Sequence, residues 1–134
     1  MTVEISSAVL RAILDESAAF PGREVCGLLF GTPDRITGAQ SCRNVDSDPA
    51  RSFEIDPAQL IAAHRAARDG GPQIIGSYHS HPVGAPVPSA RDAASAMPDR
   101  SIWLIVGGGK AGLWRAVEGG IREGLFDPVE YRLI

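Results

Sequence analysis

Two histidines separated by a single residue constrain this chain more than any other feature of its sequence. His79 and His81 end a run of apolar and small residues, 73–78, that is typical of a β-strand. Because successive side chains of a strand point to opposite faces, both imidazoles are expected on one face, roughly 7 Å apart at their roots. Such a pair can converge on one metal ion, and Asp92, brought back by the following turn, would supply a third ligand.

The connection between the second histidine and Asp92 favours this arrangement. The proline that follows His81 biases that residue toward extended geometry, which keeps the pair strand-like up to its last member. Pro86 and Pro88 stiffen the loop, so the return to Asp92 costs less conformational entropy than a flexible loop would. Ser89 is a good helix N-cap, and Asp92 stands three residues later at the spacing of a capping box.

The type of ligand indicates the type of metal. Two neutral imidazoles and a carboxylate suit Zn²⁺ better than Mg²⁺ or Ca²⁺, which prefer shells made only of oxygen. Three protein ligands leave a fourth position for water, as in a catalytic rather than a structural zinc site. In the alternative interpretation the histidines only make hydrogen bonds and Asp92 only caps a helix. The sequence predicts one zinc per chain, whereas His64, alone on an expected helix, is expected to be structural.

The remaining pattern predicts strands and helices that are interleaved without strict alternation, which favours a mixed sheet with packed helices. Asp56, Pro57 and Gln59 are expected to start the second helix as a capping box. Strands are expected over 3–5, 25–30, 35–45, 53–55, 73–81, 102–106, 113–117 and 129–134, and helices over 8–20, 57–68 and 90–96.

Length and composition predict one globular domain over residues 1–134. The net charge is −3 and basic residues do not cluster, so no nucleic-acid partner is expected. No window approaches 18 apolar residues, so no membrane association is expected. The first residues lack the pattern of a signal peptide, and Cys26 and Cys42 are widely spaced, so we expect a cytoplasmic protein with reduced cysteines.

Three motifs together resemble the JAMM (MPN+) zinc metalloprotease family, in its compact bacterial stand-alone form. The histidine pair is followed by seven residues, Ser89, two residues and Asp92, which matches the complete family motif. Glu24 precedes a Cys-Gly apolar strand over residues 25–31, and residues 51–57 are similar to bacterial members. The resemblance covers most of the chain. It implies an α/β (α+β) single domain with a mixed, mostly antiparallel, curved β-sheet flanked by helices, of the JAMM/cytidine-deaminase type.

The resemblance also implies a role for each motif residue. His79, His81 and Asp92 would bind zinc. Glu24 would hold the zinc-bound water and act as general base and then acid, chemistry that contributes roughly 10²–10⁴-fold. Ser89 would donate a hydrogen bond to the developing oxyanion. Without the family, nothing distinguishes Glu24 among 16 acidic residues, and Ser89 could serve only as a helix cap.

The implied activity is that of a zinc isopeptidase or peptidase. Compact relatives act at the C-terminus of ubiquitin-like sulfur-carrier proteins, so the expected partner is such a protein or its C-terminal adduct, cut after Gly-Gly. A non-catalytic MPN scaffold and a zinc amidase acting on a small molecule stay open as alternatives. A cysteine hydrolase is disfavoured because Cys26 lies in an apolar strand, and the His-x-Glu and Cys-x-x-Cys motifs of zinc deaminases are absent from the sequence. The identity of the carrier and the oligomeric state stay open.

Overall fold

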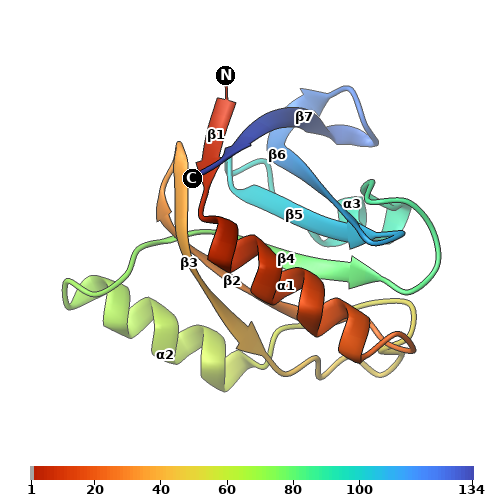
Figure 1. Cartoon of the computed structure of the whole chain (residues 1–134), viewed down its shortest axis with the longest axis horizontal. Helices are drawn as coiled ribbons and strands as arrows, with labels where there is room; N and C mark the ends of the chain where they lie inside the picture. The colour runs from red at the N-terminus through yellow and green to blue at the C-terminus, as the bar shows by residue number, and fades with distance from the viewer. Residues whose placement is uncertain (1) are drawn as a thin grey trace.

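Within residues 2–134, which the computed structural model describes, seven β-strands close into a barrel and three helices pack against it (Figure 1). The strands are β1 (Thr2–Ile5), β2 (Cys26–Thr32), β3 (Arg35–Cys42), β4 (Ile74–His81), β5 (Ile102–Gly107), β6 (Lys110–Gly120) and β7 (Gly124–Leu133). The helices are α1 (Ser7–Ala19), α2 (Pro57–Arg68) and α3 (Ala90–Ser95).

The strand order around the barrel is β1-β3-β2-β4-β5-β6-β7. Neighbouring strands are antiparallel in the pairs β2–β3, β2–β4, β5–β6 and β6–β7, and parallel in the pairs β1–β3, β4–β5 and β1–β7. The mixed, mostly antiparallel sheet flanked by helices is therefore confirmed. Its closure was not anticipated, because it depends on β1 pairing with both β3 and β7, and β7 lies at the other end of the sequence.

The pleat of β4 divides its side chains between two environments. Tyr78 points into the main core, where strands from all around the barrel pack with Leu10 and Ile13 of α1. His79 and His81 lie on the opposite face, as the alternation of strand side chains predicts. In Figure 1, α1 crosses in front of the strands β2 and β4. The central strand therefore anchors the core with one face and presents its histidines on the other.

Side chains cap the starts of both α1 and α2, but one of the hydrogen bonds predicted from the sequence at the start of α2 does not form. The Ser6 side chain caps α1 by accepting a hydrogen bond from the Val9 N–H. Asp56 caps α2 by accepting from the Ala58 N–H, but the expected capping box is wrong. The Gln59 side-chain oxygen instead accepts a hydrogen bond of 2.7 Å from the backbone N–H of a residue just after β3. A long-range backbone donor has displaced the local one.

Several element boundaries also differ from expectation. The expected strand 53–55 contributes only an isolated bridge between Asn44 and Ile55. The strands β6 and β7 begin earlier than predicted, because β6 pairs with β5 from Lys110 onward and β7 pairs with β6 from Gly124 onward. Cys26 and Cys42 are free and buried, as expected, and face each other across β2 and β3. Among residues 2–134, no helix combines the length and the apolar character that a membrane span requires.

Candidate metal centre and catalytic cleft

His79, His81 and Asp92 form a compact cluster of possible metal ligands. The Nε2 atoms of the two histidines are 3.2 Å apart. Asp92 bridges them, with its Oδ1 atom 3.1 Å from Nε2 of His79 and its Oδ2 atom 3.2 Å from Nε2 of His81. One atom from each residue lies within 4.8 Å of the others, so the three side chains could hold one metal ion. This donor set is one that Zn²⁺ favours.

Helix α3 delivers the carboxylate to the strand that carries the histidines. Ser89 is its N-cap, and its Oγ atom accepts a hydrogen bond of 3.1 Å from the Asp92 N–H. In return, Asp92 Oδ2 accepts one of 2.9 Å from the Ser89 N–H, which completes the predicted capping box. Burial alone would raise the pKa of Asp92, but its close contacts with the imidazole rings of His79 and His81, together with the hydrogen bond from the Ser89 N–H, outweigh it and hold that pKa well below its usual value. The carboxylate is therefore ionised, as a metal ligand must be.

The 82–88 loop fixes the ring of His81. Its Nδ1 atom lies 3.0 Å from the carbonyl oxygen of Ala85. A carbonyl can only accept a hydrogen bond, so Nδ1 carries the hydrogen and Nε2 presents its lone pair to the cluster in the neutral ring. Burial lowers the pKa of His81, but the Asp92 carboxylate and the Ala85 carbonyl outweigh this effect and raise it above its ordinary value.

Aromatic side chains, rather than a hydrogen bond to the Nδ1 atom, hold the ring of His79. Its ring is fully buried, and its Nδ1 atom has no hydrogen-bond partner in the part of the chain that the structure describes. Phe53 stacks on the ring with centroids 4.3 Å apart, and Trp103 meets it edge-on at 5.9 Å. Burial lowers the pKa of His79, which favours the neutral ring that a metal requires.

Glu24 lies two residues before β2 and is held by its backbone. Its N–H donates to the carbonyl of Pro49 at 2.7 Å, and its carbonyl accepts from the side-chain amide of Asn44 at 2.9 Å. The residue is only 5% exposed, and its Oε1 atom has no hydrogen-bond partner within residues 2–134. Burial raises the pKa of Glu24 to about 7. Its carboxylate can therefore gain or lose a proton near neutral pH, as a general base and acid must.

A cleft of about 500 Å³ brings the predicted catalytic residues together. Glu24, His81 and Ser89 line it, and the exposed side chains of Arg51 and Val83 stand at its walls. Cys26 is buried near the cluster, and burial raises the pKa of its thiol to about 12, so it stays protonated and is a poor nucleophile.

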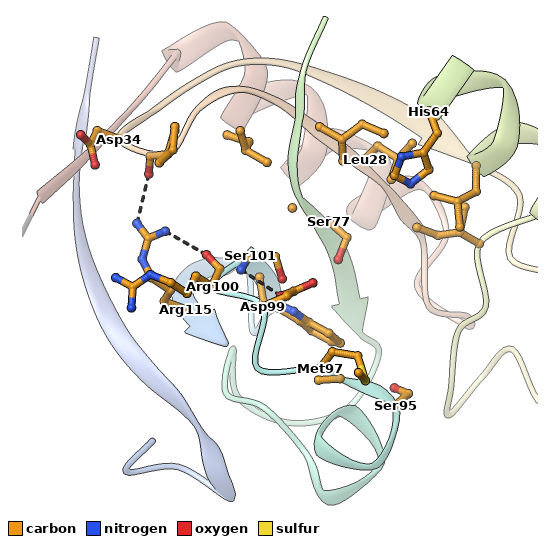
Figure 2. Close-up of a pocket in the computed structure, with 18 residues that line it drawn as sticks. Leu28, Asp34, His64, Ser77, Ser95, Met97, Asp99, Arg100, Ser101 and Arg115 are labelled. Carbon is orange, nitrogen blue, oxygen red and sulfur yellow. Dashed lines mark hydrogen bonds between the residues drawn. The ribbon is translucent and has the colours of Figure 1, made fainter. Parts of the chain in front are cut away.

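A larger cavity, of about 660 Å³, lies elsewhere on the same face of β4 and contains none of the five predicted site residues (Figure 2). Figure 2 shows Ser77 of β4 between His64 of α2 and Met97. Trp103 lines this cavity and also contacts His79. The smaller cleft is the candidate catalytic site because, among the described cavities, it alone is lined by Glu24, Ser89 and a member of the cluster, His81.

Sequence reasoning missed the residues that support the site. Phe53 belonged to a stretch similar to bacterial family members, but nothing in its pattern pointed to a histidine 26 positions away. Asn44 carries no motif, yet its side chain also donates to the Ser52 carbonyl and accepts from the N–H groups of Asp46 and Glu54. It therefore ties the loop that carries Phe53 to the backbone of Glu24.

The profile of the Prok-JAB family, described as prokaryotic homologs of the JAB domain, matches residues 6–118. The chain belongs to this family. The resemblance to compact JAMM/MPN+ proteins is thereby confirmed. The chain is 33% identical over 107 residues to a desampylase of Haloferax volcanii, covering 78% of this chain and 77% of the relative. It is 35% identical over 105 residues to a desampylase of Pyrococcus furiosus, covering 78% and 74%.

A third relative, from Thermus thermophilus, is named a probable TtuB-protein conjugate cleaving protease and is 33% identical over 92 residues, which cover 66% of this chain and 62% of the relative. Solved structures share the fold. A protein of Desulfitobacterium hafniense matches with a TM-score of 0.78 at 24% identity, covering 99% of this chain and 93% of the other. A JAB1/MPN domain protein of Archaeoglobus fulgidus matches with a TM-score of 0.59 at 18% identity, covering 98% of each.

Proposed function

We propose that this chain is a zinc-dependent isopeptidase or peptidase that hydrolyses the amide bond after the C-terminal Gly-Gly of a ubiquitin-like protein, in particular a sulfur carrier. The observation that carries the proposal is a cleft lined by the buried Glu24, by Ser89 and by His81, which belongs to the cluster of three possible metal ligands. Family membership and the names of the relatives support it. One of them is named for cleaving a protein conjugate, and two are named desampylase.

In this proposal His79, His81 and Asp92 hold the zinc. Their donor atoms converge, Asp92 is ionised and His79 is neutral, which are the protonation states that metal binding needs. When bound there, Zn²⁺ would polarise the scissile carbonyl and lower the pKa of an adjacent water molecule to about 7. Three protein ligands would leave a fourth coordination position for water or substrate.

Glu24 is the proposed general base and acid. Its carboxylate accepts a proton from the attacking water and then gives that proton to the leaving amine. The pKa of about 7 suits both steps, because the group is then neither strongly basic nor strongly acidic at neutral pH. The unpartnered Oε1 atom leaves one oxygen of the carboxylate available for this exchange.

Ser89 is the proposed donor to the oxyanion. Its oxygen already accepts from the Asp92 N–H, but no hydrogen bond among the described residues uses its hydroxyl as a donor. The hydroxyl hydrogen can therefore point into the cleft that Ser89 lines together with Glu24. One residue would both cap α3 and stabilise the developing negative charge, a contribution of about 10²-fold by comparison with other oxyanion-hole donors.

The substrate assignment rests on the relatives and on the burial of the cluster. Glycine has no side chain, so a Gly-Gly tail is the slimmest extended peptide that could reach the buried His79 and Asp92. The relatives named above are similar to this chain over about two thirds or more of its length. A non-catalytic scaffold and a small-molecule amidase are the alternatives that an experiment has to separate.

The test is intact-mass spectrometry of ubiquitin-like sulfur-carrier proteins that carry either one extra cysteine after Gly-Gly or an isopeptide-linked lysine. Each is incubated with the zinc-loaded protein, with and without a chelator, and with Glu24→Gln as a matched control. We expect chelator-sensitive loss of the extension and almost none with Glu24→Gln. Cleavage of free dipeptides alone would favour the amidase, and no cleavage of any substrate by the zinc-loaded protein would favour the scaffold.

A further inference from the structure

We propose that Trp114 is a positioning residue for the metal centre, acting through the 82–88 loop on the ring of His81. The indole Nε1–H of Trp114 donates a hydrogen bond of 3.1 Å to the carbonyl of Pro86. The neighbouring carbonyl, that of Ala85, accepts from Nδ1 of His81. The inference rests on the proposed metal site, but it concerns residues of β6 that the proposed mechanism does not use.

The Ala85 carbonyl is held in place by the loop itself. It accepts a second hydrogen bond, of 2.8 Å, from the N–H of Val87, two residues later. This is the pattern of a γ-turn centred on Pro86, whose ring already restricts the backbone. A small rotation of this turn would move the Ala85 oxygen away from His81. Any group that holds the turn in place therefore also fixes the orientation of the His81 ring.

Two glycines let the turn lie directly on the sheet. A Cβ atom added at Gly107 of β5 would lie 2.6 Å from the carbonyl carbon of Ala85. One added at Gly112 of β6 would lie 2.3 Å from the Pro86 oxygen and 3.1 Å from Nε1 of Trp114. Neither glycine has a positive φ, so close approach rather than backbone conformation explains them. Three residues therefore hold the loop against the sheet, and we call them the β5–β6 clamp: Gly107, Gly112 and Trp114. The glycines allow the close approach, and Trp114 supplies one hydrogen bond.

The clamp has a chemical consequence at Nε2 of His81. Metal-binding histidines are commonly fixed by an acceptor on their other ring nitrogen, and loss of that partner typically lowers metal affinity by roughly 10–100-fold. The Ala85 carbonyl is such an acceptor, and the clamp keeps its oxygen directed at Nδ1 of His81. Without the clamp, Nδ1 of His81 loses its fixed acceptor, and the ring can turn so that Nε2 no longer faces the donor atoms of His79 and Asp92.

The test compares Trp114→Phe, which keeps an aromatic ring and removes the N–H donor, with the wild type. The Nδ1–H of His81 is followed in zinc-loaded protein by long-range ¹H–¹⁵N imidazole spectra and by its exchange with solvent, and zinc affinity is measured by competition with a chelating dye. We expect the wild type to protect this hydrogen from exchange, and Trp114→Phe to show faster exchange and a roughly tenfold weaker zinc affinity, the low end of the range for such partners. His79, whose Nδ1 atom has no partner among the described residues, serves as the internal control.

A second variant guards against a trivial packing effect. In Gly112→Ala the new methyl group pushes the Pro86 carbonyl directly, and its matched control is Gly38→Ala, where the added Cβ makes only ordinary contacts of 3.6 and 3.7 Å with Phe30. We expect the exchange of the His81 Nδ1–H and the zinc affinity to change in Gly112→Ala and not in Gly38→Ala. Wild-type exchange and affinity in both Trp114→Phe and Gly112→Ala would overturn the inference, whether or not the protein cleaves conjugates. A wild-type protein that binds zinc but cleaves no conjugate would instead overturn the proposed function and leave the inference standing.

Discussion

His79 and His81 stand one residue apart on the same face of β4, yet the fold supports them in different ways. His81 is half-buried at the cleft and is fixed by a hydrogen bond to the Ala85 carbonyl. His79 is fully buried and lies between aromatic rings, with no partner for its Nδ1 atom among residues 2–134. A proposed ligand can therefore be oriented either by a hydrogen bond or by packing. Substitutions that remove one kind of support should affect stability and zinc affinity differently from substitutions that remove the other.

Removing each histidine gives the largest expected effects. His79→Ala and His81→Ala should both abolish zinc binding and cleavage, since each removes one of three ligands. In the metal-free protein, however, His79→Ala empties a fully buried site and should lower the free energy of unfolding by about 2–4 kcal/mol. Because the side chain of His81 is 10% exposed, His81→Ala should cost less, about 1–2 kcal/mol. Urea unfolding in a chelator checks this, and equal losses would show that packing does not distinguish the two histidines.

Replacing the base separates the ligands from the chemistry. Glu24→Gln should lower kcat/KM by roughly 10²–10⁴-fold while zinc content stays near that of the wild type. The matched control is Glu118→Gln, an exposed carboxylate on β6, which should leave both quantities unchanged. Activity of Glu24→Gln equal to the wild type would rule out Glu24 as the base.

The pKa of Glu24 predicts a pH dependence of stability. Because that pKa is about 7 in the folded protein and 4.5 is its ordinary value, the folded state binds the proton more tightly. The resulting stabilisation is full below the ordinary pKa and is lost as pH rises toward 7. In a chelator, Glu24→Gln should therefore gain about 2 kcal/mol of unfolding free energy relative to the wild type between pH 5 and pH 8. A difference that stays constant across this range would contradict the raised pKa.

Weakening the aromatic support gives the smallest effect. Phe53→Leu keeps an apolar side chain but removes the ring that stacks on His79, and zinc affinity should fall by roughly tenfold. Phe30→Leu, in a separate apolar cluster under α2, is the matched control and should bind zinc like the wild type. Dye competition measures both. An unchanged affinity in Phe53→Leu would mean that burial alone orients His79.

How well the sequence predicted the site depends on how far apart the interacting residues lie along the chain. The histidine pair, Ser89 and Asp92 lie within 14 positions, so strand alternation and helix capping were enough to predict that they meet. Glu24 lies 55 positions before His79, and only family resemblance pointed to it. The residues that orient the proposed ligands were missed because they come from separate segments: Phe53 lies in the connection between β3 and α2, and Trp114 is placed by the pairing of β5 with β6.

The wrong prediction at α2 has a related physical cause. Asp56 and Gln59 have the local pattern of a capping box, but the amide oxygen of Gln59 meets the backbone N–H of Arg43 instead. A local rule fails when a distant backbone group offers an equivalent bond. At Ser89 and Asp92 no such competitor intervenes, and the capping box forms as predicted.

The most direct measurement is the zinc content of the purified protein, determined by elemental mass spectrometry for the wild type and three variants. We expect close to one zinc per chain in the wild type and in Glu24→Gln, and almost none in His79→Ala and His81→Ala. A wild-type protein that takes up no zinc when supplied with it, or histidine variants that retain zinc at the wild-type level, would contradict the proposed metal centre.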